Sequence, residues 1–389
     1  MTQSNPHDNR QLLIMIAGIK GAVASTLALA VSAMQNDPDL VRPSLTTGAR
    51  FPHLPPLEST VVAGWDVSRQ SMADAAACQR ILPDSVCRLQ QAAMDRIEVR
   101  IAPPAEAGLR EQVDRLMADI DSFRAGHSGC LPVLVNLLPA APIQALDHCR
   151  DLEGLHRTAD AEALPDLAYA IAAVRSGIAL VNFTPNAVEL PFLIREAESR
   201  GVPVAGRDGK TGQTYLKVVL ASALKARSLT VDGWYSLNIL GNEDGRNLME
   251  PDRAAGKLAN KTDLLNDILG YPVGERYGRS THTVRIDYYP PRGDAKEAWD
   301  VVDFRGIFGL PMTLRLNLQG RDSILAAPLV LDLARWMAAA QSAGIGGALP
   351  ELGFYFKKPV GPNPPVRFEE QLAALTALER RCMEGAQRT

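Results

Sequence analysis

The stretch "LLIMIAGIKGAVASTLALAVSA" (Leu12–Ala33) sets the architecture of this 389-residue chain. Its first six residues form a short, continuous apolar run, which is typical of a buried strand. Gly18 and Gly21 then predict a tight turn, and the alanine-rich segment Ser25–Met34 predicts a helix. A membrane span or a secretory leader would not need this break, and Lys20 interrupts the apolar run. The stretch therefore indicates a strand, a glycine turn and a helix, which is how a dinucleotide-binding unit begins.

This turn and the next predicted strand supply candidates for contact with a nucleotide. The spacing of Gly18, Gly21 and Ala24 is a loose form of the glycine fingerprint that brings a pyrophosphate to a helix N-terminus. The run "TVVAGWDV" predicts a strand ending at Asp66, and an acidic residue there accepts hydrogen bonds from a ribose diol, which favours NAD over NADP. The spacing from Gly21 to Asp66 is about twice the usual ~20 residues. Asp66 therefore fits this role if the proline-rich segment 42–60 is an insertion. We therefore predict NAD as the cofactor and, as its contacts, Gly18, Gly21, Ala22, Val23, Ser25 and Asp66.

Further apolar runs predict that the first half of the chain is a parallel α/β domain. "LPVLVNLLP" (131–139) and "GIALVNFTP" (177–185) each end in proline and small polar residues, and helical stretches lie between them. Strands that alternate with helices form a parallel sheet, whose ligand crevices lie at the strand ends. We expect one such domain up to about residue 205.

The pattern changes in the last third of the chain. "HTVRIDYY" (282–289) and "MTLRLNLQ" (312–319) alternate apolar and polar residues with a period of two, which predicts antiparallel strands covered on one face. An apolar helix follows, with Asp322 placed to cap it. "GFYFKKPV" (353–360) then predicts another strand, which carries Lys357 near its end.

Composition and charge exclude several classes of partner. The formal net charge of -3 gives no basic footprint for nucleic acid, and the aromatic content of 5% offers few platforms for base stacking. The five cysteines lack paired short spacings, so they fit neither a disulfide framework nor a zinc site and favour a reducing cytoplasm. The six histidines are mostly isolated and do not signal a metal site. We therefore expect a globular cytoplasmic protein that binds neither nucleic acid, nor membranes, nor a metal ion.

A charged loop, "GRDGKTGQTYLK" (206–217), leads into a predicted helix. Apolar residues recur at helical spacing from Leu216 onward, so Thr211–Thr214 fall at the helix N-terminus. Free backbone N–H groups at such an end, together with hydroxyl, amide and ammonium groups, bind phosphate. We therefore predict a phosphate site formed by Lys210, Thr211, Gly212, Gln213 and Thr214.

Three further lysines lie in short motifs rich in glycine, asparagine and aspartate. Lys257 and Lys261 are four residues apart, which puts them on one face if their segment is helical. Lys296 lies two residues after Asp294 in "RGDAKEA". Most lysines are solvated surface residues, but these three lie in motifs that differ from an ordinary surface helix.

Six motifs occur in an order that resembles the myo-inositol-1-phosphate synthase (inositol-3-phosphate synthase) family: "GRDGKTGQT", "LNILGNEDGRNL", "GKLANK", "GDAK", "GRDSILAAPLVLDL" and "FKKP". The resemblance spans essentially the whole chain and includes "GWD" and "FTPN". It implies an α/β fold in which a Rossmann-type NAD-binding domain (10–207, completed by 323–389) carries an inserted α+β domain (208–322) for catalysis and oligomerisation. The inserted domain would contain the antiparallel sheet, and the protein would form a homotetramer.

The resemblance also implies a reaction. NAD would oxidise C5 of open-chain glucose 6-phosphate, C6 would be deprotonated to an enolate that attacks the C1 aldehyde, and NADH would return its hydride to give inositol 1(3)-phosphate. Four lysines would share the catalysis. Lys257 would manage the C5 oxygen and Lys357 the developing oxyanion or the aldehyde, while Lys261 and Lys296 would lie nearer the phosphate. Asn242 would accept hydrogen bonds from the substrate's hydroxyls and so belong to the substrate-phosphate site.

Three aspartates receive roles from the same resemblance. Asp208 would orient a lysine and contact the nicotinamide end of NAD together with Asp322, and Asp294 would position Lys296. Carboxylates belong in such a site because a group of buried ammoniums without them would lose its charge or its geometry. The predicted catalytic set is therefore Lys257, Lys261, Lys296, Lys357, Asp208 and Asp294.

The chain departs from the family pattern near the cofactor and the substrate. Family members commonly carry a longer glycine-asparagine loop and a W-T-A-N-T-E segment where this chain has "IAGIKGAVAST" and "NLLPAAP". Arg207, Glu243 and Ala259 also replace residues that are usual in the family. These departures leave two alternatives open: a cyclase for another sugar phosphate such as fructose 6-phosphate, and a non-catalytic NAD-binding homologue.

Overall fold

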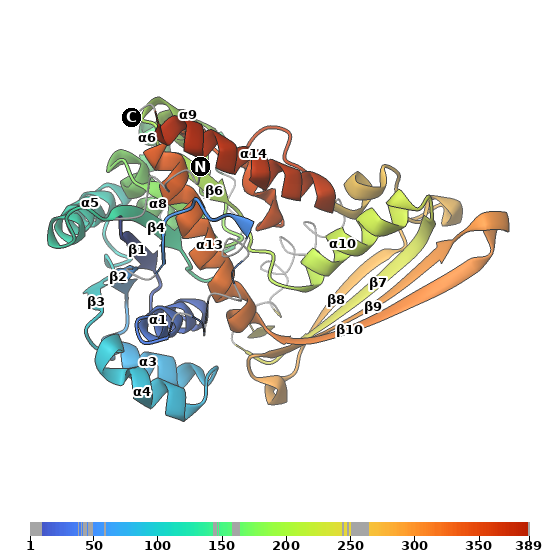
Figure 1. Ribbon diagram of the computed structural model, residues 1–389, viewed down its shortest axis with the longest axis horizontal. Coiled ribbons are helices and arrows are strands. Elements are labelled where there is room, and N and C mark those ends of the chain that lie inside the picture. Colours follow the sequence, from blue (N-terminus) through green and yellow to red (C-terminus); the bar gives the residue numbers. More distant parts are fainter. Residues whose placement is uncertain are drawn as a thin grey trace, which may run out of the picture.

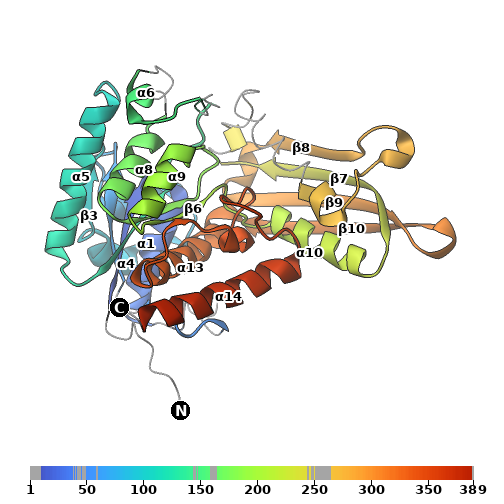
Figure 2. The same ribbon diagram turned by 90° about the horizontal axis from the view of Figure 1, so that it is seen from above.

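Two β-sheets organise the molecule, and the chain passes from the first to the second and back again (Figures 1 and 2). The computed structural model of the protein describes residues 10–37, 39, 41, 45, 50–57, 60–142, 146, 148–157, 164–242, 245–246, 249 and 264–387. A parallel sheet flanked by helices and a separate mixed sheet confirm the predicted α/β class.

The first sheet is parallel throughout, with the strand order β11-β6-β5-β4-β1-β2-β3. Its strands are β1 (Leu12–Ala17), β2 (Val61–Asp66), β3 (Glu98–Ile101), β4 (Leu131–Asn136), β5 (Ala179–Asn182), β6 (Pro203–Gly206) and β11 (Gly347–Ala348). The order reverses between β1 and β4, and a doubly wound sheet leaves a ligand crevice there, beyond the carboxyl ends of its strands.

The strand, turn and helix predicted at the start of the chain are confirmed. All six residues of β1 are buried, because its even-numbered residues pack in one hydrophobic core and its odd-numbered residues in another. Gly18 has φ +80°, a backbone conformation that favours glycine. The helix α1 (Ala22–Met34) begins three residues earlier than predicted, because Gly21 is extended and serves as its N-cap.

Helices cover both faces of the first sheet (Figure 1). One face packs against α1, α3 (Met72–Gln79), α4 (Asp84–Met94), α13 (Asp322–Ser342) and α14 (Phe368–Ala386). The other packs against α5 (Leu109–Gly126), α6 (Leu152–His156), α8 (Asp166–Arg175) and α9 (Pro191–Ser199).

The long helix α13 returns the chain to the first sheet, where it packs on α1 and on β1, β4, β5 and β6. Among the described helices it alone is long and apolar enough to cross a membrane, and 78% of its most apolar window is buried inside the fold, as in a core helix. The helix α14 packs on α13 and also contacts α10, the helix of the second sheet (Figures 1 and 2).

The second sheet has the strand order β10-β9-β7-β8. Its strands are β7 (Thr230–Leu240), β8 (His282–Tyr288), β9 (Ala295–Arg305) and β10 (Pro311–Arg321), and the 3-10 helices between them are η3 (Glu275–Tyr277), η4 (Pro290–Arg292) and η5 (Ile307–Gly309). The helix α10 (Gln213–Ala226) covers one face, where Val218, Trp234 and Val302 belong to a third core.

Only part of the predicted antiparallel pairing is confirmed. β10 pairs antiparallel with β9, as expected for 312–319, but β8 pairs in parallel with β7, so the expectation for 282–289 is wrong. Parallel neighbours need a long crossover, which residues 241–281 supply here. Alternation with a period of two predicts which face a side chain lies on but not the direction of the strand.

Two further expectations are corrected near the C-terminus. The segment 353–360 is not a strand, since the 3-10 helix η6 (Pro350–Phe354) enters it and, among the described residues, its one β-bridge joins Phe356 to Gly209. Further backbone hydrogen bonds tie this segment to the loop after β6 without forming a ladder. Asp322 does not cap α13, because Arg321 ends β10 in an extended conformation and is itself the N-cap, which makes Asp322 the first helical residue.

Candidate active site

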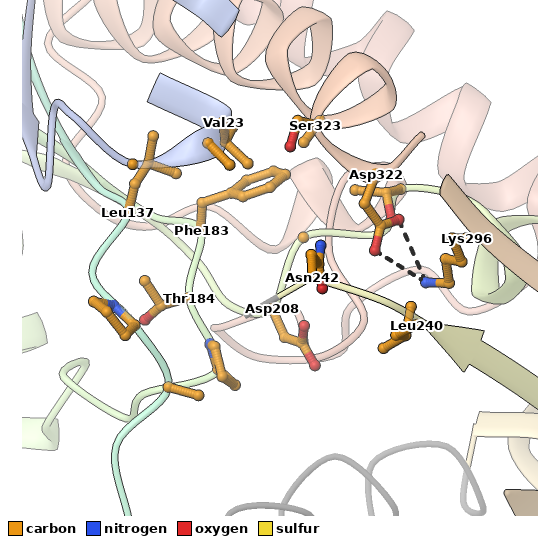
Figure 3. A pocket seen from close by; sticks show the side chains of 18 of the residues that line it. Val23, Leu137, Phe183, Thr184, Asp208, Leu240, Asn242, Lys296, Asp322 and Ser323 are labelled. Carbon is orange, nitrogen blue, oxygen red and sulfur yellow. Dashed lines mark hydrogen bonds and ion pairs between the residues drawn. The ribbon is translucent and has the colours of Figure 1, made fainter. Parts of the chain in front are cut away.

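A cavity of about 330 Å³ is lined by residues from both sheets (Figure 3). The first sheet contributes the segments that follow the carboxyl ends of its central strands: Gly18 after β1, 137–140 after β4, 183–185 after β5, and 208–209 and 211–214 after β6. The second sheet and its neighbours contribute Asn238, Leu240, Asn242, Ile286, Lys296, Asp322, Ser323, Ala326 and Lys357. The cavity therefore occupies the topological switch point at which doubly wound sheets bind ligands.

The N-termini of α1 and α10 both line this cavity. Gly21–Ala24 lie at the start of α1 and Gly212–Thr214 at the start of α10, as predicted for the helix after the charged loop. Neither first turn contains an acidic residue, so the partial positive charge of the free N–H groups is not cancelled within the helix. The cavity thus offers two separate positions for phosphate groups.

Two lysine-aspartate pairs line the cavity. The Nζ of Lys357 lies 2.6 Å from Oδ1 of Asp208, and the Nζ of Lys296 lies 3.3 Å from Oδ2 of Asp322. Figure 3 shows the side chains of Lys296 and Asp322 pointing toward each other. Thr211 donates from Oγ1 to Oδ1 of Asp322 at 3.0 Å, which ties the start of α10 to this pair.

The charge environment keeps Asp322 ionised. Burial acts to raise the pKa of its carboxyl, but Lys296 and Lys357 outweigh burial and hold that pKa below its usual value. An ionised Asp322 in turn fixes the Lys296 ammonium at the cavity wall. The prediction that Asp294 positions Lys296 is corrected here, since Asp294 accepts a hydrogen bond from Ser323 and Asp322 is the carboxylate beside Lys296.

Lys210 is the clearest departure from the predicted phosphate site. Its side chain is buried and reaches α14, with Nζ donating to the carbonyl of Gly353 and to Oε1 of Gln371, each at 3.0 Å. Gly209 bridges to Phe356, which turns the Lys210 side chain toward the C-terminal helix while Thr211 faces the cavity. Burial, reinforced by the Lys357 ammonium, lowers the pKa of Lys210 to about 7.

Two other predicted residues, Asp66 and Ser25, are not among those that line the cavity. Asp66 accepts hydrogen bonds from the backbone N–H groups of Lys20 and Ser68, each at 2.9 Å, and so holds the glycine turn from the end of β2. Ser25 is buried and donates to the carbonyl of Ala22. The other predicted cofactor contacts at the glycine turn do line the cavity: Gly18, Gly21, Ala22 and Val23.

The remaining substrate candidates divide between the cavity and the chain that the structure does not describe. Gly212, Gln213, Thr214 and Asn242 line the cavity as predicted. The catalytic candidates Lys257 and Lys261 lie outside the described residues.

Sequence reasoning missed part of the wall. Asn238 lies two residues before Leu240 on β7, so both face the cavity. Phe183 and Ile286 add apolar side chains to the wall, and Thr184 lines it as well. The alternation in "SLNIL" contained the signal for Asn238, because residues two apart on a strand share a face. The strand itself was not predicted.

Comparisons with known proteins agree with this arrangement. A family model for myo-inositol-1-phosphate synthase matches residues 212–323. Inositol-3-phosphate synthase 1 of Bacteroides thetaiotaomicron is 33% identical over 394 aligned positions, which cover 90% of each chain. The inositol-3-phosphate synthase of Trypanosoma brucei brucei is 32% identical, and the match covers 73% of this chain and 58% of that protein.

A solved structure shares the fold. The inositol-3-phosphate synthase of Caenorhabditis elegans superposes with a TM-score of 0.84 at 20% sequence identity, covering 97% of this chain and 86% of that one. The chain therefore belongs to the inositol-3-phosphate synthase family of enzymes.

Proposed function

We propose that the chain is an NAD-dependent cyclase that converts glucose 6-phosphate into inositol phosphate. One observation carries the proposal: a single cavity joins the N-terminus of α1, the N-terminus of α10 and the two ammoniums of Lys296 and Lys357. A dinucleotide and a phosphorylated sugar need these groups next to each other. The names of the relatives, inositol-3-phosphate synthases, support the same reaction.

The glycine turn fits the dinucleotide. A Cβ at Gly18 would lie 3.3 Å from the carbonyl oxygen of Leu137, so a side chain there would crowd the turn against the wall after β4. The backbone at Gly21–Val23 would hold the pyrophosphate, and Asp66 keeps free lone pairs for a ribose hydroxyl. NAD, when bound, supplies a reversible acceptor for the hydride of the sugar carbon.

The start of α10 fits the sugar phosphate. Gly212–Thr214 would present backbone N–H groups and the Thr214 hydroxyl, while Lys296 would add a positive charge. The Thr211 hydroxyl donates to Asp322, so its contribution is to hold Asp322 rather than to bind phosphate directly.

The two lysine-aspartate pairs fit the chemistry at the sugar's oxygens. Lys357, held by Asp208, and Lys296, held by Asp322, would donate hydrogen bonds to oxygens that gain negative charge as the ring closes. Leu137, Phe183 and Ile286 form an apolar wall that keeps water away from the reactive carbons.

Product analysis tests this proposal. Purified protein is incubated with NAD and either glucose 6-phosphate or fructose 6-phosphate, and the products are identified by NMR and mass spectrometry. We expect inositol phosphate from glucose 6-phosphate without accumulation of NADH. A carbocycle formed from fructose 6-phosphate alone would favour the other cyclase, NADH release would favour a plain dehydrogenase, and the absence of any product would favour a non-catalytic homologue.

We further propose that the protein is a cytoplasmic homotetramer whose partners are small molecules, with no nucleic acid or membrane among them. The outer face of the second sheet supports assembly, since Tyr235 and Trp299 on its central strands are 40% and 49% exposed. Light scattering of the eluting protein measures the mass, and a monomeric mass would contradict this part of the proposal.

We also propose a division into an NAD-binding domain, 10–207 with 323–389, and a catalytic domain, 208–322. β11, α13 and α14 support it, since all three belong to the first sheet or its core.

A further inference from the structure

A buried row of side chains leads from the cavity wall into the second sheet. Asn238 donates from Nδ2 to Oε1 of Gln213 at 2.5 Å, and Gln213 donates from Nε2 to Oδ2 of Asp300 at 2.8 Å. Ser236 donates a hydrogen bond to Oδ1 of Asp300 at 2.5 Å and accepts one from Nζ of Lys217 at 3.1 Å. All five residues are at most 5% exposed, so none of these bonds competes freely with water.

The polarity of this row is fixed at its inner end. The Lys217 ammonium can only donate, and so can the Trp234 indole, whose Nε1 lies 2.7 Å from Oδ1 of Asp300. Burial lowers the pKa of Lys217 to about 8 against the opposing effect of Asp300. Ser236 must therefore accept from Lys217 and donate to Asp300.

The polarity then passes through two amides. A carboxylate accepts only, so Gln213 must turn its NH2 toward Asp300 and its oxygen toward Asn238. Asn238, which lines the cavity, must in turn use its NH2 for Gln213. Its Oδ1 is buried and receives no hydrogen bond from any described residue, so it is the acceptor of this row that stays available for a ligand at the wall.

We propose that Asp300 is a positioning residue: through Gln213 it orients Asn238 so that the cavity wall offers a hydrogen-bond acceptor to one hydroxyl of the bound sugar phosphate. The inference rests on the proposed function for the identity of the ligand. Gln213 and Asn238 touch the cavity, whereas Asp300 acts only through them.

The variant Asp300→Asn reverses this polarity without changing the shape of the site. The Asn side chain has a single amide oxygen, and the donors Trp234 and Ser236 both point to the Oδ1 position. The new NH2 then faces Gln213, which must turn its oxygen inward and its NH2 toward Asn238. Asn238 consequently presents its own NH2 to the cavity, and the wall becomes a donor.

The experiment compares glucose 6-phosphate with its deoxyfluoro analogues at C2, C3, C4 and C5 by titration calorimetry. Fluorine accepts weakly and cannot donate, so the wild-type acceptor should reject one analogue by roughly 10- to 100-fold, the range expected when a buried acceptor loses its partner. In Asp300→Asn we expect that discrimination to fall to within a few-fold, while glucose 6-phosphate, whose hydroxyl both donates and accepts, binds nearly as before.

Matched variants separate positioning from general damage. Asp303→Asn changes an exposed carboxylate on the same strand, which accepts a hydrogen bond from Thr313, and should leave the discrimination intact. If Asp300→Asn does not fold, Gln213→Leu breaks the same row while leaving Trp234 and Ser236 bonded to Asp300, and it should also abolish the discrimination.

The outcomes are distinguishable. This inference alone would be overturned if the wild-type protein bound glucose 6-phosphate and all its deoxyfluoro analogues with equal affinity. It would also be overturned if Asp300→Asn or Gln213→Leu still rejected the same analogue as strongly as the wild-type protein does. Failure of glucose 6-phosphate to bind the wild-type protein would contradict the proposed function itself, and the inference with it.

Discussion

Lys357 and Asp208 are joined twice, although they are 149 positions apart in the chain. Their side chains form an ion pair at 2.6 Å, and the backbone N–H of Lys357 donates to the carbonyl of Asp208 at 2.8 Å. The single bridge between Gly209 and Phe356 extends this contact by one more residue on each side. The C-terminal segment thereby places Lys357 beside the loop after β6, at the wall of the cavity.

Replacing Lys357 tests its proposed part in catalysis. Lys357→Met keeps an aliphatic side chain but removes the ammonium, so we expect the rate of inositol phosphate formation to fall by roughly 10²- to 10⁴-fold, as for loss of a general acid or base. Lys358→Met is the matched control, because Lys358 is the next residue in the chain and its side chain is exposed. Full activity in Lys357→Met, with its fold confirmed by circular dichroism, would remove Lys357 from the mechanism.

The glycine turn is tested at Gly18. Gly18→Ala puts a Cβ against the carbonyl of Leu137 in a residue with φ +80°, so we expect a loss of about 1–2 kcal/mol in the free energy of unfolding and weaker NAD binding by calorimetry. Gly177→Ala is the control, since Gly177 has φ +68° but open space around it. Both variants should lose stability, yet only Gly18→Ala should lose affinity for NAD. Equal NAD affinity in the two variants would argue against a nucleotide at this turn.

Lys210 should make stability depend on pH. Its pKa of about 7 in the folded protein lies below the ~10.4 of an unfolded lysine, so between these values the unfolded chain binds a proton that the folded chain does not. The free energy of unfolding should therefore rise with pH across this window, with a contribution of at most about 1.4 kcal/mol per pH unit. Below pH 7 the cost of burying the charge is fully present.

Urea titrations from pH 6.5 to 10 measure this slope. Lys210→Met should flatten it, because Met fills the space beside Gln371 and does not titrate. The neighbouring Lys357 ammonium, which adds to the lowered pKa, is unchanged in the variant. Parallel curves for the two proteins would show that Lys210 does not titrate in this range.

The first sheet was predictable because its signals are local. The apolar run 12–17 has no alternation, which only burial on both faces explains, and two glycines mark the turn that follows. The N-terminus of α10 was predictable in the same way, from apolar spacing after the charged loop.

The second sheet and the partners of its lysines were less predictable because they depend on distant segments. Whether β8 runs parallel to β7 is decided by the crossover between them, which a strand's own pattern does not encode. Asp294 is only two residues from Lys296 in sequence, yet the carboxylate that pairs with Lys296 is Asp322, the first residue of α13.

Lys210 shows the same limit at a single residue. A lysine within a phosphate-binding loop suggests a ligand, but the bridge between Gly209 and Phe356 directs it into the interior. That bridge joins residues 147 positions apart, so the local sequence of the loop does not predict it.

Isotope transfer measures most directly whether one cavity carries out an internal oxidation and reduction. Glucose 6-phosphate labelled with deuterium at C5 is converted in the presence of unlabelled NAD, and the inositol phosphate is examined by NMR. If the sugar's hydrogen is taken up and returned within the same closed site, the product keeps its deuterium on one ring carbon. Product that has lost the label, with deuterium appearing in free NADH, would contradict this mechanism.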